Sequence, residues 1–436
     1  MENTITEQPK TKKKGKGLKV LAIVVASIVL LVLILMSVTL IGDNNTTNMA
    51  KSFASAKFDG QIVPVKDADG DWTFTTDREF KIMQLTDVHI GGGFISLAKD
   101  RQALTTVATM IQAEKPDLII VTGDIAFPVP YVAGTFNNLL STQIFINLME
   151  QLQIYWTVTL GNHDSESYSY FNREQIGQAY SDASYDGTNS NHCLFMMGSK
   201  DADGVGNQTI KVKKGNGVVT QVLSLFDSHA YTDGDVLGIN WKYDNFHENQ
   251  LTWYQNKINT VTESNKTIEP TCGIVKSLAF FHIPFHAYRD AWKEYYLNNK
   301  ADTVNVKRVY GEMGEKGGIN ASGQETYAVF CGVGETDKTF DAFVNSKSLQ
   351  GAFCGHDHLN NQALLYKGIQ LTYSYSIDCL AYASINQYGA QRGCTIIKVN
   401  TDGTFASQLH NYYQEYATQA EKDAVIMEPY YVDIGY

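Results

Sequence analysis

The sequence predicts an α/β fold: a four-layer αββα sandwich of two mixed β-sheets flanked by helices, preceded by one N-terminal transmembrane helix. Three observations predict this architecture. From Phe80 onward, apolar runs alternate with helical stretches, the pattern of βαβ units in a parallel sheet. After residue 350, short alternating runs follow one another without helices, as antiparallel strands do. Ahead of both, the 22 residues from Val20 to Ile41 are apolar and uncharged.

The N-terminal segment has the composition of a membrane anchor. Residues 1–19 carry six lysines and two glutamates, and the apolar run follows directly. At about 1.5 Å per residue the run can span a hydrocarbon core of about 30 Å, and it exceeds the roughly 7–15 apolar residues of a signal peptide. We therefore expect a basic cytoplasmic tail at 1–19 and an uncleaved signal anchor at 20–42. A long, cleaved signal peptide is the alternative.

The positive-inside bias places the lysines in the cytoplasm, so the chain after Asp43 is expected on the far side of a single-pass membrane segment. Residues 43–76 are polar and rich in Asn, Thr and Asp. They predict a short stalk and then a hairpin around residues 67–71, which leads into a globular domain at 77–436.

The globular domain is acidic. The chain has 436 residues, 44% hydrophobic, and a formal net charge of −11, of which residues 1–20 contribute +4. The remaining charge of −15 disfavours nucleic acid as a partner, because an acidic surface repels phosphate backbones. Six cysteines without CxxC spacing exclude zinc fingers. A Cys379–Cys394 disulfide is permitted outside the cytoplasm, but buried free cysteines are the favoured interpretation. The oligomeric state is not indicated.

The first half of the domain predicts three parallel strands. Strands are expected at 80–86, 117–122 and 154–160, with helices at about 97–114 and 136–153 between them. Asp87, Asp124 and Asn162 follow the three strands at intervals of 37 and 38 residues. One βα unit per interval returns each polar residue to the same sheet edge, where the carboxyl ends of parallel strands gather ligands.

The second half is less regular. Residues 165–215 and 300–327 are polar insertions that we expect near the site entrance. The other expected elements are strands at 219–226, 276–282 and 350–355, helices from about 247 and at 338–346, and short runs at 362–367, 369–375, 394–399 and 404–410. The short runs are expected to complete the second sheet as antiparallel strands.

Five clusters of polar residues lie at the ends of apolar runs. They are Asp87-Val88-His89, Gly123-Asp124, Gly161-Asn162-His163-Asp164, the lone His282, and Gly355-His356-Asp357-His358. Each cluster alone is a weak signal, since a pair such as the last one occurs by chance in many chains. Together they supply the oxygen and nitrogen ligands that hold two divalent cations around a shared carboxylate.

In this order the clusters resemble those of the calcineurin-like metallophosphoesterases, and the likeness covers roughly residues 80–399. Smaller stretches at 225–229, 281–284 and 355–360 are most similar to the branch related to purple acid phosphatases. The resemblance implies that one metal is bound by Asp87, His89 and His358, that the other is bound by Asn162, His282 and His356, and that Asp124 bridges both.

The resemblance also implies a catalytic role for His163, which would stabilise the transition state and protonate the leaving oxygen, with Asp164 fixing its tautomer. Purple acid phosphatases carry a GDxxY tyrosine on iron(III) and lack the first histidine. Here Phe127 stands at the tyrosine position and His89 is retained. Because phenylalanine cannot bind a metal, we expect two divalent ions of Mn, Zn, Fe or Co, without deciding between them.

The implied function is that of a membrane-anchored dinuclear-metal phosphoesterase that hydrolyses phosphomonoesters by metal-activated water attack on a small phosphorylated substrate. Two alternatives stay open. The same metal pair serves phosphodiesterases that act on nucleotides or lipid head groups, and the sequence does not separate the two. A catalytically inactive surface binding protein on the same scaffold is the other, although all seven candidate ligands are retained.

Overall fold

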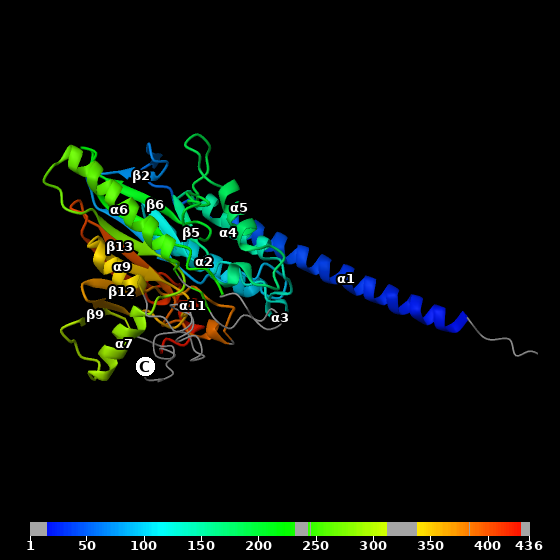
Figure 1. The fold of residues 1–436 in the computed structure, drawn as a ribbon. Coiled ribbons are helices and arrows are strands. Elements are labelled where there is room, and N and C mark those ends of the chain that lie inside the picture. The colour runs from blue at the N-terminus through cyan, green and yellow to red at the C-terminus, as the bar shows by residue number, and fades with distance from the viewer. Residues whose placement is uncertain (1–14, 232–242, 245, 312–337, 383, 429–436) are drawn as a thin grey trace, which may run out of the picture.

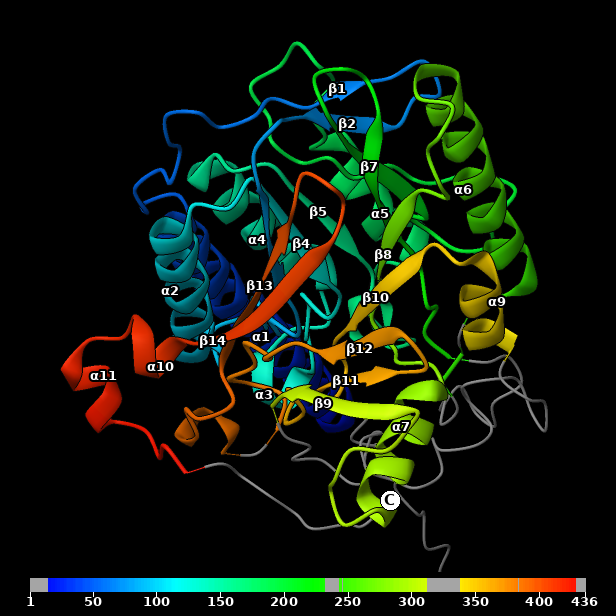
Figure 2. The same cartoon turned by 90° about the vertical axis from the view of Figure 1, so that its left-hand side faces the viewer.

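The computed structural model describes residues 15–231, 243–244, 246–311, 338–382 and 384–428. Two β-sheets pack face to face, with helices on both outer faces, as Figures 1 and 2 show. The core between the sheets contains side chains of both, such as Ile82 and Phe280. The expected four-layer αββα sandwich is therefore confirmed.

The five-stranded sheet contains the three parallel strands that the sequence predicts. Its members, in spatial order, are β14 (Phe405–Asn411), β13 (Gly393–Val399), β3 (Phe80–Leu85), β4 (Leu118–Thr122) and β5 (Trp156–Thr159). β3, β4 and β5 pair in parallel, and β13 pairs antiparallel with β3 and β14. The expectation that the last two runs belong to the second sheet is wrong. They extend the first sheet, because β13 covers the edge of β3 that β4 leaves open.

The second sheet is larger and mixed. In spatial order it contains β1 (Val65–Lys66), β2 (Trp72–Thr75), β6 (Gln208–Lys213), β7 (Val219–Leu225), β8 (Lys276–Phe280), β10 (Leu349–Cys354), β12 (Ile369–Tyr373), β11 (Ala363–Tyr366) and β9 (Val306–Tyr310). β1 and β2 form the expected antiparallel hairpin. β12 differs in part from the antiparallel expectation, since it lies antiparallel to β11 but parallel to β10.

Helices cover the outer face of each sheet. Over the five-stranded sheet lie α2 (Leu97–Glu114), α4 (Asn138–Leu152) and α5 (Arg173–Asp182), and over the nine-stranded sheet lie α6 (Glu248–Ile268), α7 (Ala287–Leu297) and α9 (Lys338–Ser346). Shorter helices are α3 (Pro130–Ala133), α10 (Tyr412–Glu415), α11 (Gln419–Asp423) and the 3-10 turns η1 (His163–Ser165) and η4 (Ile385–Gln387). The two expected insertions contain regular structure, since α5, β6 and β9 fall within them. Residues 312–327 of the second lie outside the described residues.

Helix α1 (Gly15–Ala50) projects from the domain (Figure 1). Its apolar side chains are exposed from Leu18 to Ile41, and it is long and apolar enough to cross a membrane. It differs from the expected stalk, because the helix continues to Ala50 and its last turns pack on α2 and α4. The close packing depends on Gly42, where a Cβ would lie 2.5 Å from the backbone nitrogen of Phe94.

The disulfide considered from the sequence is not formed. Cys379 and Cys394 are both free and buried. Burial raises the pKa of each thiol. They act as small apolar side chains in the packing.

Candidate metal centre

The polar clusters meet where strands of both sheets end. Asp87 and Asp124 each come two residues after their strands, β3 and β4, and Asn162 comes three residues after β5. His282 and His356 come two residues after β8 and β10 of the other sheet. Because these strands run in parallel within their sheets, their carboxyl ends deliver the side chains to one place.

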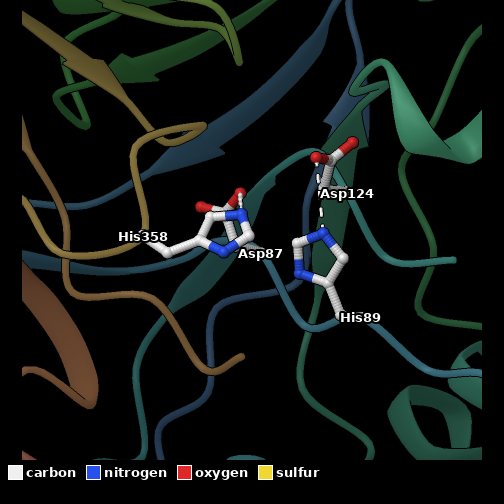
Figure 3. Close-up of side chains that lie close together, drawn as sticks. All are labelled: Asp87, His89, Asp124 and His358. Atoms are coloured by element: carbon white, nitrogen blue, oxygen red, sulfur yellow. Dashed lines mark ion pairs between the residues drawn. The ribbon is translucent and has the colours of Figure 1, made fainter. Parts of the chain in front are cut away.

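One group consists of Asp87, His89, Asp124 and His358, whose nitrogen and oxygen atoms lie within 4.8 Å of one another (Figure 3). His358 Nε2 lies 3.4 Å from Asp87 Oδ1, and His89 Nε2 lies 3.5 Å from Asp124 Oδ2. All four side chains are buried. The imidazoles and carboxylates point toward one another, so the space between them is lined by donor atoms.

A second group shares Asp124 with the first. It adds His282 and His356, again with donor atoms within 4.8 Å. His282 Nε2 lies 3.1 Å from Asp124 Oδ2. The amide oxygen of Asn162 lies 3.2 Å from His282 Nε2 and 3.1 Å from His356 Nδ1. The structure therefore brings together all seven residues singled out in the sequence, in two groups that meet at Asp124.

The buried donor set fits divalent cations. Among the described residues, neither ring nitrogen of His89 makes a hydrogen bond, and Asp124 Oδ2 accepts none of good geometry although His282 Nε2 lies 3.1 Å away. A buried polar atom left without a partner costs about 1–3 kcal/mol, so native proteins rarely keep several at one place. Imidazole nitrogens with carboxylate and amide oxygens suit Mn, Zn, Fe or Co.

Backbone strain is concentrated at the same residues. Asp87, His89, Asp124 and His356 have φ values of 53°, 51°, 53° and 75°. For residues other than glycine this left-handed conformation costs on the order of 1–3 kcal/mol each, and it persists where function requires a given side-chain direction. The site also requires a glycine at position 161, because a Cβ there would collide with the Asp124 carboxylate.

A further carboxylate, Asp378, orients His358 and lies near His89. Its Oδ2 lies 2.9 Å from His358 Nδ1, and its Oδ1 lies 3.8 Å from His89 Nδ1. His282 Nδ1 similarly donates to the carbonyl of Thr122 at 2.7 Å. Such contacts turn the other ring nitrogen toward a metal. Sequence reasoning missed Asp378, which comes five residues after β12, farther from its strand end than any of the seven candidate ligands.

His163 stands at the open side of the centre. Its backbone N–H donates to Asp124 Oδ1 at 2.8 Å, and its side chain is 26% exposed. Its ring lies 4.9 Å from the ring of Phe127 and 5.5 Å from that of His89. The imidazole therefore adjoins both groups and still reaches solvent.

The partner of His163 is Glu166, and the expectation that Asp164 fixes its tautomer is wrong. His163 Nδ1 lies 2.7 Å from Glu166 Oε1. Asp164 instead accepts backbone N–H groups of Gly161 and of residues 124–126, at 2.8–3.0 Å. Asp164 thus ties two site loops together. Glu166 could have been found, since it follows His163 at a spacing of three.

Tyr231 was also missed. Its hydroxyl donates to Glu166 Oε1 at 2.7 Å and accepts from the Asn162 Nδ2 amide at 3.2 Å. This contact fixes the amide orientation, so that Asn162 Oδ1 faces His282 and His356. No local pattern in the sequence indicates this long-range contact.

The charges of the site favour cations. Burial opposes ionisation of Asp124, but His282 and His163 hold the pKa of its carboxyl well below the ordinary value. Burial likewise opposes ionisation of Asp87, whose pKa His358 lowers. Burial and the neighbouring His282 keep the pKa of His356 low, so its ring is neutral. For His163, Asp124 and Glu166 outweigh burial and raise the pKa to about 9.

Comparison with known proteins agrees with this geometry. The family model for the calcineurin-like phosphoesterases matches residues 80–360. The chain belongs to the calcineurin-like phosphoesterase family. The resemblance found in the sequence is therefore confirmed, and members of this family generally hydrolyse phosphoesters with two divalent metals.

Two relatives and one solved structure illustrate the similarity. The chain is 27% identical over 336 residues to "Probable inactive purple acid phosphatase 28" of Arabidopsis thaliana, covering 73% of this chain and 75% of that protein. It is 26% identical over 309 residues to "Phosphatase DCR2" of Saccharomyces cerevisiae, covering 66% of this chain and 46% of that protein. The structure of a dimetal phosphatase from Danio rerio aligns at 11% identity with a TM-score of 0.41, over 76% of this chain and 99% of that one.

Proposed function

We propose that this chain is a membrane-anchored dinuclear-metal phosphoesterase that hydrolyses phosphomonoesters. The observation that carries the proposal is the position of Asp124, whose carboxylate belongs to both groups of buried donors. A shared carboxylate offsets the repulsion between two cations about 3.5–4 Å apart, a spacing that lets the pair bind one phosphate.

Each candidate ligand has a place in this proposal. Asp87, His89 and His358 would hold one ion, Asn162, His282 and His356 would hold the other, and Asp124 would contact both. Two divalent cations held there supply the Lewis acidity that activates water and neutralises phosphate charge. Asn162 contributes a neutral oxygen, which leaves the loaded site positive enough to attract an anionic ester.

His163 is the proposed general acid. With Nδ1 held by Glu166, the other ring nitrogen, Nε2, is free to donate its proton to the leaving oxygen. General acid catalysis of this kind contributes roughly 10²–10⁴-fold. Phe127 packs edge-on against His163 and His89 and limits the water around the proton donor. Asp164 supports the site by joining its loops.

Two alternatives remain. A phosphodiesterase would use the same residues, with its preference set by the loops around the entrance. The second alternative is an inactive binding protein. The name of the Arabidopsis relative favours this alternative, because it calls that protein probably inactive. Against it stand the retained donor set, the strained backbone at four of the seven residues and the intact His163–Glu166 pair.

The anchoring part of the proposal rests on α1. Residues 20–42 form the span, residues 1–19 remain in the cytoplasm, and the metallophosphoesterase domain, residues 77–436, lies outside. The apolar length of α1 and the lysines ahead of it support this topology. Protease added to intact cells should then digest the domain and spare the N-terminal tail. Complete protection of the domain would contradict the topology.

Hydrolysis by the full chain, purified in detergent, tests the activity. We expect it to cleave aryl and alkyl phosphomonoesters faster than the matching diesters, to lose activity on chelation and to regain it with a divalent metal. Faster diester cleavage would favour the phosphodiesterase. Two bound metals without hydrolysis of either class would favour the binding protein, and full activity in metal-free chain would contradict the proposal.

A further inference from the structure

The exposed aromatic side chains of the domain lie on one face. Among the described residues, five aromatic residues are 38–82% exposed: Phe94, Tyr131, Phe136, Tyr168 and Tyr170. They come from three loops that also border the metal centre. Tyr170 is tied to the middle loop, since its ring stacks on that of Phe136 at 6.1 Å and its N–H donates to the Phe136 carbonyl. We call this surface, with the adjoining Ile95, the aromatic face.

The aromatic face adjoins the point where α1 leaves the domain. The Thr39 hydroxyl donates to the carbonyl of Gly134 at 3.3 Å, directly after α3. Gly42 packs against the backbone of Phe94. Gly134 also lies beside Ile95, since a Cβ there would be 3.2 Å from Ile95 Cγ1. Figure 1 shows α3 at the base of the projecting part of α1.

These contacts fix the position of the aromatic face along the axis of α1, relative to the end of the apolar run. The apolar run ends at Ile41, between the contacts at Thr39 and Gly42. Those contacts are separated by three residues, or about 4–5 Å of helix. No spacer separates the domain from the end of the span, so loops in contact with it lie at the level of lipid head groups. Aromatic side chains are enriched at that level in membrane proteins.

An apolar wall leads from the metal centre to the aromatic face. Phe127 contacts His89 and His163 at the centre and packs with Val129, Val132 and Leu380. Val129 directly precedes α3, so this cluster continues into the loop that carries Tyr131. Tyr168 lies near Glu166, and partial burial together with the charge of Glu166 raises the pKa of the Tyr168 hydroxyl.

We propose that the aromatic face rests on the lipid bilayer and that the metal centre therefore takes as its substrate a phosphate ester carried by a membrane lipid. The inference rests on the proposed function and on retention of α1 in the membrane. The phosphate of such a lipid lies at the height of the loops, and its chains extend along the apolar wall into the bilayer. A soluble ester requires neither a site at the level of the head groups nor an apolar wall for acyl chains.

Fluorescence quenching tests the docking without any activity. Full-length Tyr131→Trp and the control Leu297→Trp are reconstituted in phosphatidylcholine vesicles with brominated acyl chains, and each is compared with the unaltered chain. Leu297 is exposed at the end of α7, and Figure 1 shows α7 on the side of the domain away from α1. We expect added quenching at Tyr131→Trp and none at Leu297→Trp. Equal quenching at both sites, or none at Tyr131→Trp, would overturn docking and would fit a face covered by protein.

Hydrolysis tests the substrate class. The unaltered chain should hydrolyse dioleoyl phosphatidic acid in the same vesicles, and the double variant Phe94→Ser/Tyr131→Ser should be about tenfold slower, since it loses part of two interfacial contacts. Its rate on a soluble aryl phosphate should be unchanged, as should both rates of Leu297→Ser. Hydrolysis of the aryl phosphate alone, or an equal loss on both substrates, would overturn the lipid assignment. Absence of hydrolysis of both would refute the proposed function itself, while the quenching result would stand.

Discussion

Two clusters of histidine and aspartate in this protein differ in how many of their ring nitrogens and carboxylate oxygens lack a hydrogen-bond partner. The metal centre and a second group, His229, Asp244 and His247, each bring imidazoles and carboxylates within 4.8 Å. In the second group His247 faces a carboxylate on each ring nitrogen, with Asp203 at 2.9 Å and Asp244 at 3.2 Å. At the metal centre both nitrogens of the buried His89 lack a hydrogen bond among the described residues.

The difference shows that proximity of potential ligands is a weak criterion for a metal site. The second group is partly exposed, and its hydrogen bonds satisfy His247 without an ion. The ring of His229 stacks on His247 at 4.1 Å, and burial lowers its pKa, so this neighbour is neutral. Among the described residues, His229 Nδ1 also lacks a hydrogen bond and His229 has a φ of 61°, but only the metal centre combines complete burial of its donors with several unpaired donor atoms and four strained residues, which together require a further partner. We therefore expect metal at the first group and none at the second.

The largest effect is expected from Asp124→Asn. Removing the shared charge leaves the repulsion between two cations uncompensated, so both ions and all measurable activity should be lost. Metal content per chain, measured by plasma mass spectrometry, and the rate on an aryl phosphate check the result. The matched control Asp244→Asn should keep both. Retention of two metals in Asp124→Asn would show that it is not the bridge.

His163→Ala should separate chemistry from metal binding. The variant should retain both metals and lose roughly 10²–10⁴-fold in kcat on an alkyl phosphate, with a smaller loss on an aryl phosphate, whose leaving group needs less protonation. Glu166→Gln should show the same preference for the aryl ester with a milder loss, because the ring remains but its orientation is less fixed. If His163→Ala loses metal, His163 is itself a ligand.

Asp378→Asn should have an intermediate effect. Because Asp378 orients His358 without belonging to the donor set, its loss should weaken metal binding by roughly 10–100-fold. Titration with Mn²⁺ or Zn²⁺ measures the change. Asp203→Asn, which removes the corresponding carboxylate from the second group, serves as the control and should leave metal affinity unaltered. Equal effects of the two substitutions would erase the distinction between the clusters.

His247→Gln should give the smallest effect, and it should depend on pH. Hydrogen bonding to Asp244 and Asp203 outweighs burial and raises the pKa of His247 to about 9. A histidine pKa above its unfolded value of about 6.5 means that the stabilisation is complete below pH 6.5 and is lost as the pH rises through 9. The variant should therefore have a Tm lower by about 1–2 °C at pH 6, and no difference at pH 10. A difference that grew with pH would contradict the ion-pair interpretation.

The sequence predicted those parts of the site that depend on local pattern. Asp87, Asp124 and Asn162 could be found because each follows a strand at the period of one βα unit. Asp378 and Tyr231 could not, because they lie five and six residues beyond β12 and β7, outside any motif, and reach the site through long-range contacts. Their roles follow only from the positions of His358 and Asn162 in the fold.

The fold shows the same limit. Alternation identified residues 394–399 and 404–410 as strands, but alternation does not say which sheet edge a strand pairs with, and β13 joined β3. Residues 43–50 were expected in a stalk because Asn and Thr are common in loops. One feature of the sequence does indicate a helix there. The small residues Gly42, Thr46 and Ala50 are spaced four apart, so they lie on one side of α1, and this side packs against the domain.

The central claim is that two groups of donors meeting at Asp124 bind a pair of divalent cations. Anomalous X-ray scattering from crystals of the chain loaded with Mn²⁺ tests it most directly. The account predicts two peaks about 3.5–4 Å apart on either side of the Asp124 carboxylate, and none beside His247. A single peak at the centre, or a peak between His229 and His247 with none at Asp124, would contradict it.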